Sequence, residues 1–482
     1  MSAMKTLIIG AGFTGVQLAR ELVAVSGEVV LVDMDAERVR HAADRLDCTV
    51  VEADGRDLGS LERAGLASAD ALVALTEDDE VNMVICSLAD SVYPWVSKIA
   101  RVRNYAYYRS AGEARERARA ERPDARPLYG IDTMLNPEVE AASAIASAVE
   151  HGAVGSVIEI GGGYGIATLS VGEGSPLDGL SLRQVSALEG WSYLVAFLDS
   201  RGEMSLPNGD TVVRKGDFVG VVTPKGAIAR LLEFTKTPKA DIRRVVLFGA
   251  DRVGSLLLAR RQARRSPSSW LGLLGLAPSE PEVEVVVVDR DAALCRETVE
   301  RFPGVRVLCG DVTDEGLLDE EDLFSADLLV AASGNHELNL VTAAYMKSRG
   351  VKKTVALTAN SSYGPVARKL GVDVAVPMRG SVVDAIMGHL RGKNVKSVHS
   401  VCNRRFEIVE GEIAQKAPVE GRTLAELASK SPDGPLVLLF RAPGDAAWSV
   451  PRGGAPMARG SSVVLIARSG DVASESRFFG KA

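Results

Sequence analysis

The chain repeats itself, and this repeat constrains its possible folds more than any other feature. Residues 7–15 match residues 246–254, and residues 30–33 match residues 286–289. Further matches then keep one constant offset between the copies: Asp54 with Asp311, Asp57 with Asp314, Asp70 with Asp327, Thr76 with Ser333, Glu80 with Glu337 and Asn82 with Asn339. Chance similarity does not hold one register over so many positions, so the chain contains two copies of a large unit.

A second, smaller repeat follows each large one. Residues 175–179 match 417–421, and residues 215–219 match 459–463. The chain is therefore organised as large, small, large, small. We expect a first Rossmann-like domain, a connecting helix and a small domain, followed by a second set of the same three parts, at residues 1–135, 136–155, 156–237, 240–380, 381–400 and 401–472.

Short apolar runs alternate with helical stretches in each large unit. In the first unit the runs are β-branched and apolar on both faces, at residues 6–9, 29–32, 48–52, 71–75 and 98–102. Helical patterns lie between them, at residues 14–25, 36–46 and 80–91. This alternation predicts an α/β fold with two Rossmann-like, doubly wound parallel sheets. The small units, near residues 156–234 and 405–468, predict small α+β domains.

Each large unit is followed by an amphipathic helix. Asn136, Pro137 and Glu138 give the first one a cap, a first-turn proline and a first-turn acid. Its apolar stripe is Val139, Ala142, Ile145, Ala146 and Val149, and that of its counterpart is Val382, Val383, Ile386, Met387 and Leu390. Such a stripe either packs locally or dimerises, and the sequence leaves both alternatives open.

Composition excludes several classes of protein. The 482 residues suggest three or four domains, and a hydrophobic content of 46% with 25% charged residues is that of a soluble globular protein. A net charge of −7 argues against general binding of nucleic acid. We expect no signal peptide, and the apolar runs are too short to span a bilayer, so any membrane role goes through a partner. The cysteines show no metal or redox spacing, which favours free thiols in a reducing cytosol: Cys48, Cys86, Cys295, Cys309 and Cys402.

Two segments interrupt the repeat. Residues 113–122 are rich in Arg and Glu and predict a solvated helix. Residues 260–281 carry a basic run and then an apolar one that begins at Trp270. Such a segment either touches a partner or a membrane surface, or is a loop tucked against its own domain.

A glycine motif carries the chemistry of the first unit. Gly10, Gly12 and Gly15 follow a predicted strand and open a predicted helix that includes Phe13 and Thr14. In this context Gly10 permits a tight turn, Gly12 lets the backbone approach a phosphate, and Gly15 lets the helix lie close to the strand. The helix N-terminus then offers N–H groups and a positive dipole end to the anion.

Charged residues end the neighbouring strands. Asp33 follows the second strand, where a carboxylate accepts both ribose hydroxyls and repels a 2′-phosphate, so NAD is preferred over NADP. Asp54 either contacts the adenine or ribose or simply forms an Asp-Gly turn. Arg101 and Arg103 end the fifth strand, where doubly wound sheets place ligands, and guanidinium groups suit phosphate oxygens. Surface ion pairs are the alternative for these arginines.

The second unit lacks several of these features. Asp251 stands where the first unit has Gly12, and Leu357 and Ala359 replace the two arginines, although Asp289 and Asp311 remain. A carboxylate at the phosphate position predicts a weak or empty site. An uncharged or singly phosphorylated adenosine group is the ligand that such a site could still accept.

We find no catalytic residues or metal site in the sequence. A dehydrogenase needs a proton donor beside the nicotinamide and a substrate pocket. The histidines share no motif and none is repeated between the halves: His41, His151, His336, His389 and His399. A nucleotide that binds without reacting can shift a conformational equilibrium. The sequence therefore favours a regulatory protein over the alternative, an NAD-dependent oxidoreductase of unknown substrate.

The chain resembles the TrkA family, which are the regulatory subunits of Trk potassium-uptake systems. Members of this family contain two RCK domains, and each RCK domain consists of a KTN domain and a C-terminal domain. The resemblance covers nearly the whole chain, and its main segments are residues 8–12, 32–33, 52–55, 74–82 and 100–104. The residue Asp251 and the two insertions depart from the family pattern.

The resemblance implies a cytoplasmic protein that is attached to the inner face of the cell membrane through its partner, a TrkH/TrkG-like potassium transporter. It also implies a homo-oligomeric ring, a dimer or tetramer, in which NAD(H) and ATP/ADP compete at the first unit and favour different ring shapes. By the same analogy the nucleotide contacts are Gly10, Gly12, Asp33, Asp54, Thr76 and Arg101.

Overall fold

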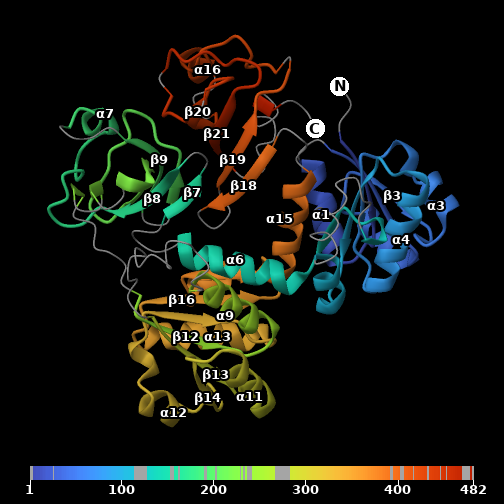
Figure 1. The fold of residues 1–482 in the computed structure, drawn as a ribbon, viewed down its shortest axis with the longest axis horizontal. Coiled ribbons are helices and arrows are strands. Elements are labelled where there is room, and N and C mark those ends of the chain that lie inside the picture. The colour runs from blue at the N-terminus through green and yellow to red at the C-terminus, as the bar shows by residue number, and fades with distance from the viewer. Residues whose placement is uncertain are drawn as a thin grey trace.

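The computed structural model contains two large lobes and two small domains (Figure 1). It describes residues 4–24, 27–112, 128–151, 157–160, 163–188, 193–200, 203–227, 230–231, 234–235, 242–265, 283–390, 395–401, 406–415, 417–430, 434–445, 447–451, 453–468 and 478–479. The predicted helix at residues 113–122 lies outside these ranges. Of residues 260–281, only 260–265 are described, as the end of a helix.

The first lobe is a six-stranded parallel sheet with the strand order β3-β2-β1-β4-β5-β6. Its strands are β1 (Lys5–Ile9), β2 (Glu28–Asp33), β3 (Thr49–Glu52), β4 (Ala71–Ala74), β5 (Ser97–Arg101) and β6 (Thr133–Leu135). Its helices include α1 (Phe13–Ala24), α2 (Ala36–Ala43), α3 (Leu58–Arg63) and α4 (Asp79–Val92). This strand order is that of a Rossmann sheet, which places ligands at the carboxyl ends of the strands.

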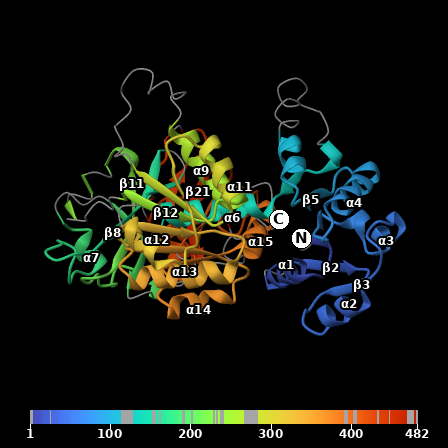
Figure 2. The ribbon, with the colours of Figure 1, turned by 90° about the horizontal axis from the view of Figure 1, so that it is seen from below.

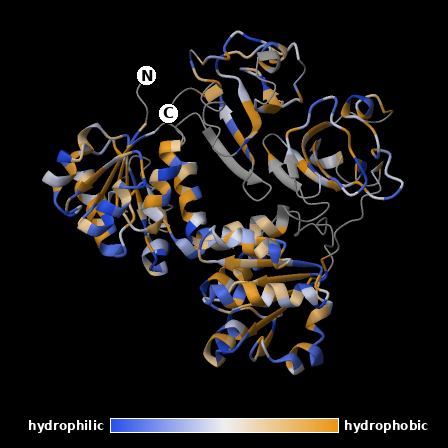
Figure 3. Ribbon diagram, turned by 180° about the vertical axis from the view of Figure 1, so that it is seen from behind, coloured by the Kyte–Doolittle hydropathy of each residue, from blue (hydrophilic) through white to orange (hydrophobic). Residues whose placement is uncertain are grey.

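The second lobe repeats this topology, with the order β14-β13-β12-β15-β16-β17. Its strands are β12 (Arg244–Phe248), β13 (Glu284–Asp289), β14 (Arg306–Cys309), β15 (Leu328–Ala331), β16 (Lys353–Thr358) and β17 (Val374–Pro377). Its helices are α9 (Arg252–Arg265), α11 (Ala292–Arg301), α12 (Glu315–Glu320), α13 (His336–Ser348) and α14 (Tyr363–Lys369). Figure 3 shows the central strands of both lobes as apolar, with hydrophilic residues on the outer helices, as a covered parallel sheet requires.

The two small domains are antiparallel sheets that pack against each other. The first has the order β10-β9-β11-β8-β7, and the second has the order β18-β19-β21-β20. Their elements are β7 (Val157–Ile160), β8 (Tyr164–Ser170), α7 (Leu182–Val185), β9 (Leu194–Ser200), β10 (Glu203–Ser205), β11 (Phe218–Pro224), β18 (Val395–Val401), β19 (Phe406–Glu412), α16 (Leu424–Lys430), β20 (Leu436–Arg441) and β21 (Ser462–Arg468). One shared core joins Phe197 and Val222 of the first domain to Leu439 and Ile466 of the second.

The two connecting helices cross over between the lobes (Figures 1 and 2). Helix α6 (Pro137–His151), which follows the first lobe, buries Ala141, Ala142 and Ile145 in the core of the second lobe. Helix α15 (Met378–Leu390), which follows the second lobe, buries its apolar stripe in the core of the first lobe, beside α1. Each helix thus packs against the opposite lobe of the same chain, an arrangement that differs from packing on its own lobe.

The second connecting helix is shorter than the expected 381–400. It begins at Met378, directly after strand β17, and ends at Leu390. Residues 395–401 instead form strand β18, where three valines in seven residues favour an extended chain. Of the helices that the structure describes, none has the length and apolarity that a membrane crossing requires.

Candidate nucleotide-binding site

The glycine loop joins β1 to α1, and its three glycines serve different purposes. Gly10 has a φ of 111°, and a Cβ there would lie 3.0 Å from the backbone of Leu75. A Cβ on Gly15 would lie 1.9 Å from the carbonyl oxygen of Gly10. A Cβ on Gly12 would meet nothing within 4 Å, because this glycine faces a cavity. Packing therefore requires Gly10 and Gly15, whereas Gly12 leaves open space in front of the first N–H groups of α1.

Asp33 fixes the shape of this loop. It ends β2, its side chain is buried, and its Oδ2 accepts a hydrogen bond from the backbone N–H of Ala11 at 2.6 Å. Its Oδ1 accepts one from Asp35 N–H at 2.9 Å. Each carboxylate oxygen keeps a further acceptor position, and the residue lines the cavity. Asp33 can therefore hold the loop and still accept ribose hydroxyls.

Asp54 is held by a neighbour that the sequence did not single out. Its Oδ1 accepts hydrogen bonds from the Nε and the backbone N–H of Arg56, both at 2.9 Å, and its Oδ2 accepts one from Nη2 at 2.8 Å. The side-chain hydrogen bonds from Arg56 lower the pKa of Asp54. Asp54 thus forms the Asp-Gly turn that we considered, and it also lines the cavity.

A buried asparagine joins the ends of β4 and β5. The Oδ1 of Asn82 accepts hydrogen bonds from the backbone N–H of Thr76 at 2.9 Å and from its hydroxyl at 2.7 Å. The Nδ2 of Asn82 donates to the carbonyl of Arg101 at 2.9 Å. In the second lobe Asn339 makes the same bonds to Ser333 and Leu357. The paired asparagines were visible in the repeat, but their role as positioning residues was not predicted.

The two arginines after β5 differ in their surroundings. The Nη2 of Arg101 donates to the carbonyl of Thr76 at 2.5 Å, while its Nε is buried without a hydrogen-bond partner. Burial, reinforced by the nearby charge of Arg103, lowers the pKa of Arg101 to about 10. The backbone N–H of Arg103 donates to Asp79 Oδ1 at 3.0 Å, which fixes the turn. Both side chains line the cavity.

These residues surround a single cavity of about 430 Å³, a size that suits a nucleotide. All the predicted site residues line it except Gly15, which lies beneath the loop. Lining residues that the sequence analysis missed include Met34, Arg38, Arg56 and Arg379. The sequence of the first lobe gives no indication that Arg379 lines its cavity, because Arg379 belongs to α15, which follows the second lobe.

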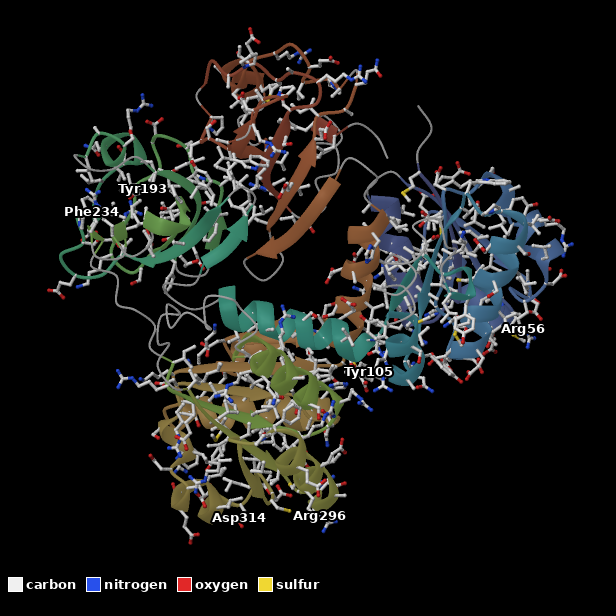
Figure 4. All side chains as sticks on the ribbon, in the orientation of Figure 1. Arg56, Tyr105, Tyr193, Phe234, Arg296 and Asp314 are labelled. Carbon is white, nitrogen blue, oxygen red and sulfur yellow. The ribbon has the colours of Figure 1, made fainter. Side chains whose placement is uncertain are left out.

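The corresponding position in the second lobe is filled by the protein itself. The Oδ1 of Asp251 accepts hydrogen bonds from the N–H groups of Val253 at 3.2 Å and Gly254 at 3.5 Å, at the start of α9. Burial raises the pKa of Asp251. Beside it, Arg252 pairs with Glu138 of α6 at 3.9 Å and lies over the ring of Tyr105, at the boundary between the lobes (Figure 4). Among the described residues there is no cluster of three or more metal-ligating side chains.

Comparison with known proteins follows the same division of the chain. A TrkA-N domain model matches residues 6–119 and 276–377, and a TrkA-C domain model matches residues 166–236. The Trk system potassium uptake protein TrkA of Halomonas elongata is 28% identical over 432 residues, covering 88% of each chain. The TrkA homolog 1 of Methanosarcina mazei is 27% identical over 483 residues, covering 99% of this chain and 100% of that protein.

Solved structures show the same fold. The GsuK RCK domain has a TM-score of 0.54 at 18% identity, covering 97% of this chain and 93% of that chain. The GsuK channel bound to NAD has a TM-score of 0.55 at 18% identity, covering 100% of this chain and 79% of that chain. With its two Rossmann-like sheets, each followed by a small antiparallel RCK C-terminal domain, the chain belongs to the family of TrkA potassium uptake proteins.

Proposed function

We propose that this chain is a regulatory subunit that senses adenine nucleotides and gates a membrane potassium transporter of the TrkH/TrkG type. NAD(H) and ATP/ADP are the competing ligands, and the first lobe is the sensing site. The protein works at the inner face of the cell membrane as a homo-oligomeric ring attached to the transporter. Its role is to signal nucleotide state, so the nucleotide leaves the site chemically unchanged.

The observation that carries the proposal is the composition of the first-lobe cavity. An open phosphate cradle at Gly12, a ribose-accepting carboxylate at Asp33 and the guanidinium groups of Arg101 and Arg103 line one space. These groups match the parts of an adenine nucleotide in order: ribose at the end of β2, phosphates at the start of α1, and further phosphate charge at the end of β5. The related GsuK channel, which has this fold, has been solved bound to NAD.

Gating requires the ligands to favour different conformations. A ligand shifts an equilibrium only by the difference between its affinities for the two states. The phosphates of ATP draw Arg101 and Arg103 inward, whereas a dinucleotide extends along the strand ends toward the neighbouring unit. Two ligands of different shape and charge at one site can therefore stabilise different arrangements of the ring.

Binding measurements on an arginine variant test the sensing site. Arg101→Ala should weaken ATP binding more than NAD binding, because ATP carries more phosphate charge. Arg296→Ala is the control, since Arg296 lies at the far end of the second lobe (Figure 4). Equal losses for ATP and NAD in the Arg101 variant would count against this assignment.

Co-purification from native membranes tests the regulatory role. The full-length protein should retain an adenine nucleotide and bring down a potassium transporter, and both can be identified by mass spectrometry. Purified protein that binds neither NAD(H) nor ATP would refute the proposal. Consumption of NADH together with a carbonyl substrate would instead establish the oxidoreductase alternative.

A further inference from the structure

One arginine that lines the first-lobe cavity comes from the other half of the chain. Arg379 is the second residue of α15, which follows the second lobe. The central carbon of its guanidinium lies 5.1 Å from the centroid of the Phe13 ring, and Phe13 is the first residue of α1. Arg379 therefore stands beside the helix end that offers N–H groups to an anion.

Arg379 completes a cluster of three guanidinium groups that have no directly paired carboxylate, although the charges of Asp79 and Glu77 act on Arg101 from nearby. Arg101 and Arg103 line the same cavity, and the charge of Arg379 acts on Arg101. Within the described part of the chain, none of these three side chains forms an ion pair with a carboxylate. The Nε of Arg101 is also buried without a hydrogen-bond partner. Unpaired guanidinium groups around a cavity are suited to binding a multiply charged anion.

The helix that carries Arg379 is firmly attached to the first lobe. The side chains of Val383 and Ile386 are fully buried in the core that contains Leu18 and Leu22 of α1. The position of Arg379 relative to the glycine loop is therefore set by packing. A ligand that binds the guanidinium of Arg379 therefore also acts on α15, which belongs to the second half of the chain.

The opposite lobe shows the reverse charge at the matching place. The second residue of α6 is Glu138, which faces the second lobe and pairs with Arg252 beside Asp251. The first-lobe cavity thus receives a cation from the other half, whereas the second lobe receives an acid. This asymmetry favours a polyanionic ligand in the first lobe only.

We propose that Arg379 binds the terminal phosphate of an adenosine di- or triphosphate held in the first lobe, so that both halves of the chain recognise the ligand's charge. This inference rests on the proposed nucleotide-sensing function. A terminal phosphate carries a charge of about −1.5 to −2 at pH 7, whereas each phosphate of a dinucleotide's diphosphate bridge carries a single charge and the bridge continues into a second riboside. ATP therefore ties α15 to the first lobe more strongly than NAD does, which gives the two ligands different effects on the arrangement of the lobes.

Calorimetric titration of the full chain with AMP, ADP, ATP and NAD tests this assignment. In wild type the affinity should increase from AMP to ATP. Arg379→Gln should reduce ATP affinity about tenfold or more, as expected for the loss of a charge-assisted hydrogen bond. AMP and NAD affinities should change much less. Arg379→Lys, which keeps the charge, should retain part of the preference for ATP.

Arg252→Gln provides the matched control. It removes an arginine from the same boundary between the lobes, where Arg252 contacts Glu138 and Tyr105, but no charge from the first-lobe cavity. Its ligand series should match that of wild type. An equal loss for all four ligands in Arg379→Gln, or the same loss in both variants, would overturn the inference. A wild-type protein that binds none of these nucleotides would instead refute the proposed function.

Discussion

At Gly12, more clearly than at any other residue of the candidate site, a substitution should affect ligand binding without affecting folding. A Cβ there meets nothing within 4 Å, whereas a Cβ on Gly15 would lie 1.9 Å from a backbone oxygen. Gly12→Ala should therefore change the free energy of unfolding by less than about 0.5 kcal/mol, yet obstruct the approach of a phosphate. Calorimetry should show a strong loss of ATP and NAD affinity. Gly15→Ala should instead lower the melting temperature, and unchanged nucleotide binding in Gly12→Ala would contradict this view of the loop.

The paired asparagines allow a test of positioning with an internal control. Asn82→Ala leaves the N–H of Thr76 and the carbonyl of Arg101 without their partner, as Asn339→Ala does for Ser333 and Leu357. Each variant should lose about 1–3 kcal/mol of stability in denaturant unfolding. Only Asn82→Ala should also weaken nucleotide binding, because its bonds fix the end of β5. Comparable losses of binding in both variants would remove the special role of the first lobe.

At the same scale, sequence reasoning located those cavity-lining residues whose position depends on neighbours in the chain. Gly10, Gly12 and Asp33 belong to one continuous strand–loop–helix–strand unit, from β1 to β2, so their spacing predicted their shared cavity. Arg379 was missed because its place in the site depends on the packing of α15 against the first lobe. Arg56 was missed because a bidentate partner for Asp54 depends on the local turn.

Among the elements, the connecting helices show what the repeat could and could not predict. The apolar stripe of α15 was correct in all five residues, whereas that of α6 was correct at Ala142, Ile145 and Val149 but omitted the buried Ala141. The parallel sheets followed from alternating strands and helices. The lobe against which each stripe packs was not predictable, because a helical period defines which face of a helix is buried but not the element that covers it. The short strand β6 was missed because its three residues have too little pattern. The crossing of α6 and α15 makes each lobe's core incomplete without the other half.

This crossing predicts that the two halves of the chain are stabilised together. Ile386 of α15 is fully buried in the first lobe. Ile386→Ala should cost about 2–5 kcal/mol and should destabilise the first lobe, although the residue follows the second. Hydrogen exchange resolved by segment can measure where protection is lost. Val341→Ala, at a side chain that is 61% exposed, is the control. Loss of protection confined to the second lobe would contradict the crossed arrangement.

A lysine at this crossing gives the stability a dependence on pH. The Nζ of Lys353, on β16, donates to the carbonyl of Ala148 on α6 at 3.2 Å, and burial lowers the pKa of Lys353 from 10.5 to about 8. Below pH 8 this lysine is charged in both the folded and unfolded states, so its desolvation penalty is fully present. Between pH 8 and 10.5 the unfolded chain binds more protons, so stability rises with pH.

Lys353→Met should remove this contribution. The variant should be more stable than wild type at pH 7, by about 1–3 kcal/mol once partial solvation and the lost hydrogen bond are discounted. The difference should shrink as the pH approaches 10.5. Chemical unfolding at several pH values measures it, with Lys369→Met, at an exposed lysine of α14, as the control for a change from lysine to methionine. A difference that does not vary with pH would show that burial of the charge is not the cause.

For the whole molecule, the two lobes share one topology but differ in what occupies the start of the first helix. In the first lobe Gly12 leaves this place open, whereas in the second lobe the carboxylate of Asp251 accepts hydrogen bonds from Val253 and Gly254. A carboxylate at a helix N-terminus uses the same N–H groups that a phosphate would. The duplicated chain therefore combines a lobe whose first helix is open to a ligand with a lobe whose anion is built in.

This asymmetry predicts the stoichiometry of binding. Wild type should bind a single NAD per chain in calorimetric titration, and Asp251→Gly should add a second site by exposing the α9 N–H groups. The new site should be weaker than the first, because Leu357 and Ala359 supply no guanidinium and Glu138 adds negative charge nearby. Asp251→Asn, which removes the charge but keeps the side chain in place, should still bind a single NAD. If Asp251→Gly also bound only one, the second lobe would be closed by its acidic surroundings rather than by this carboxylate, since the freed helix end would then be insufficient to attract a phosphate.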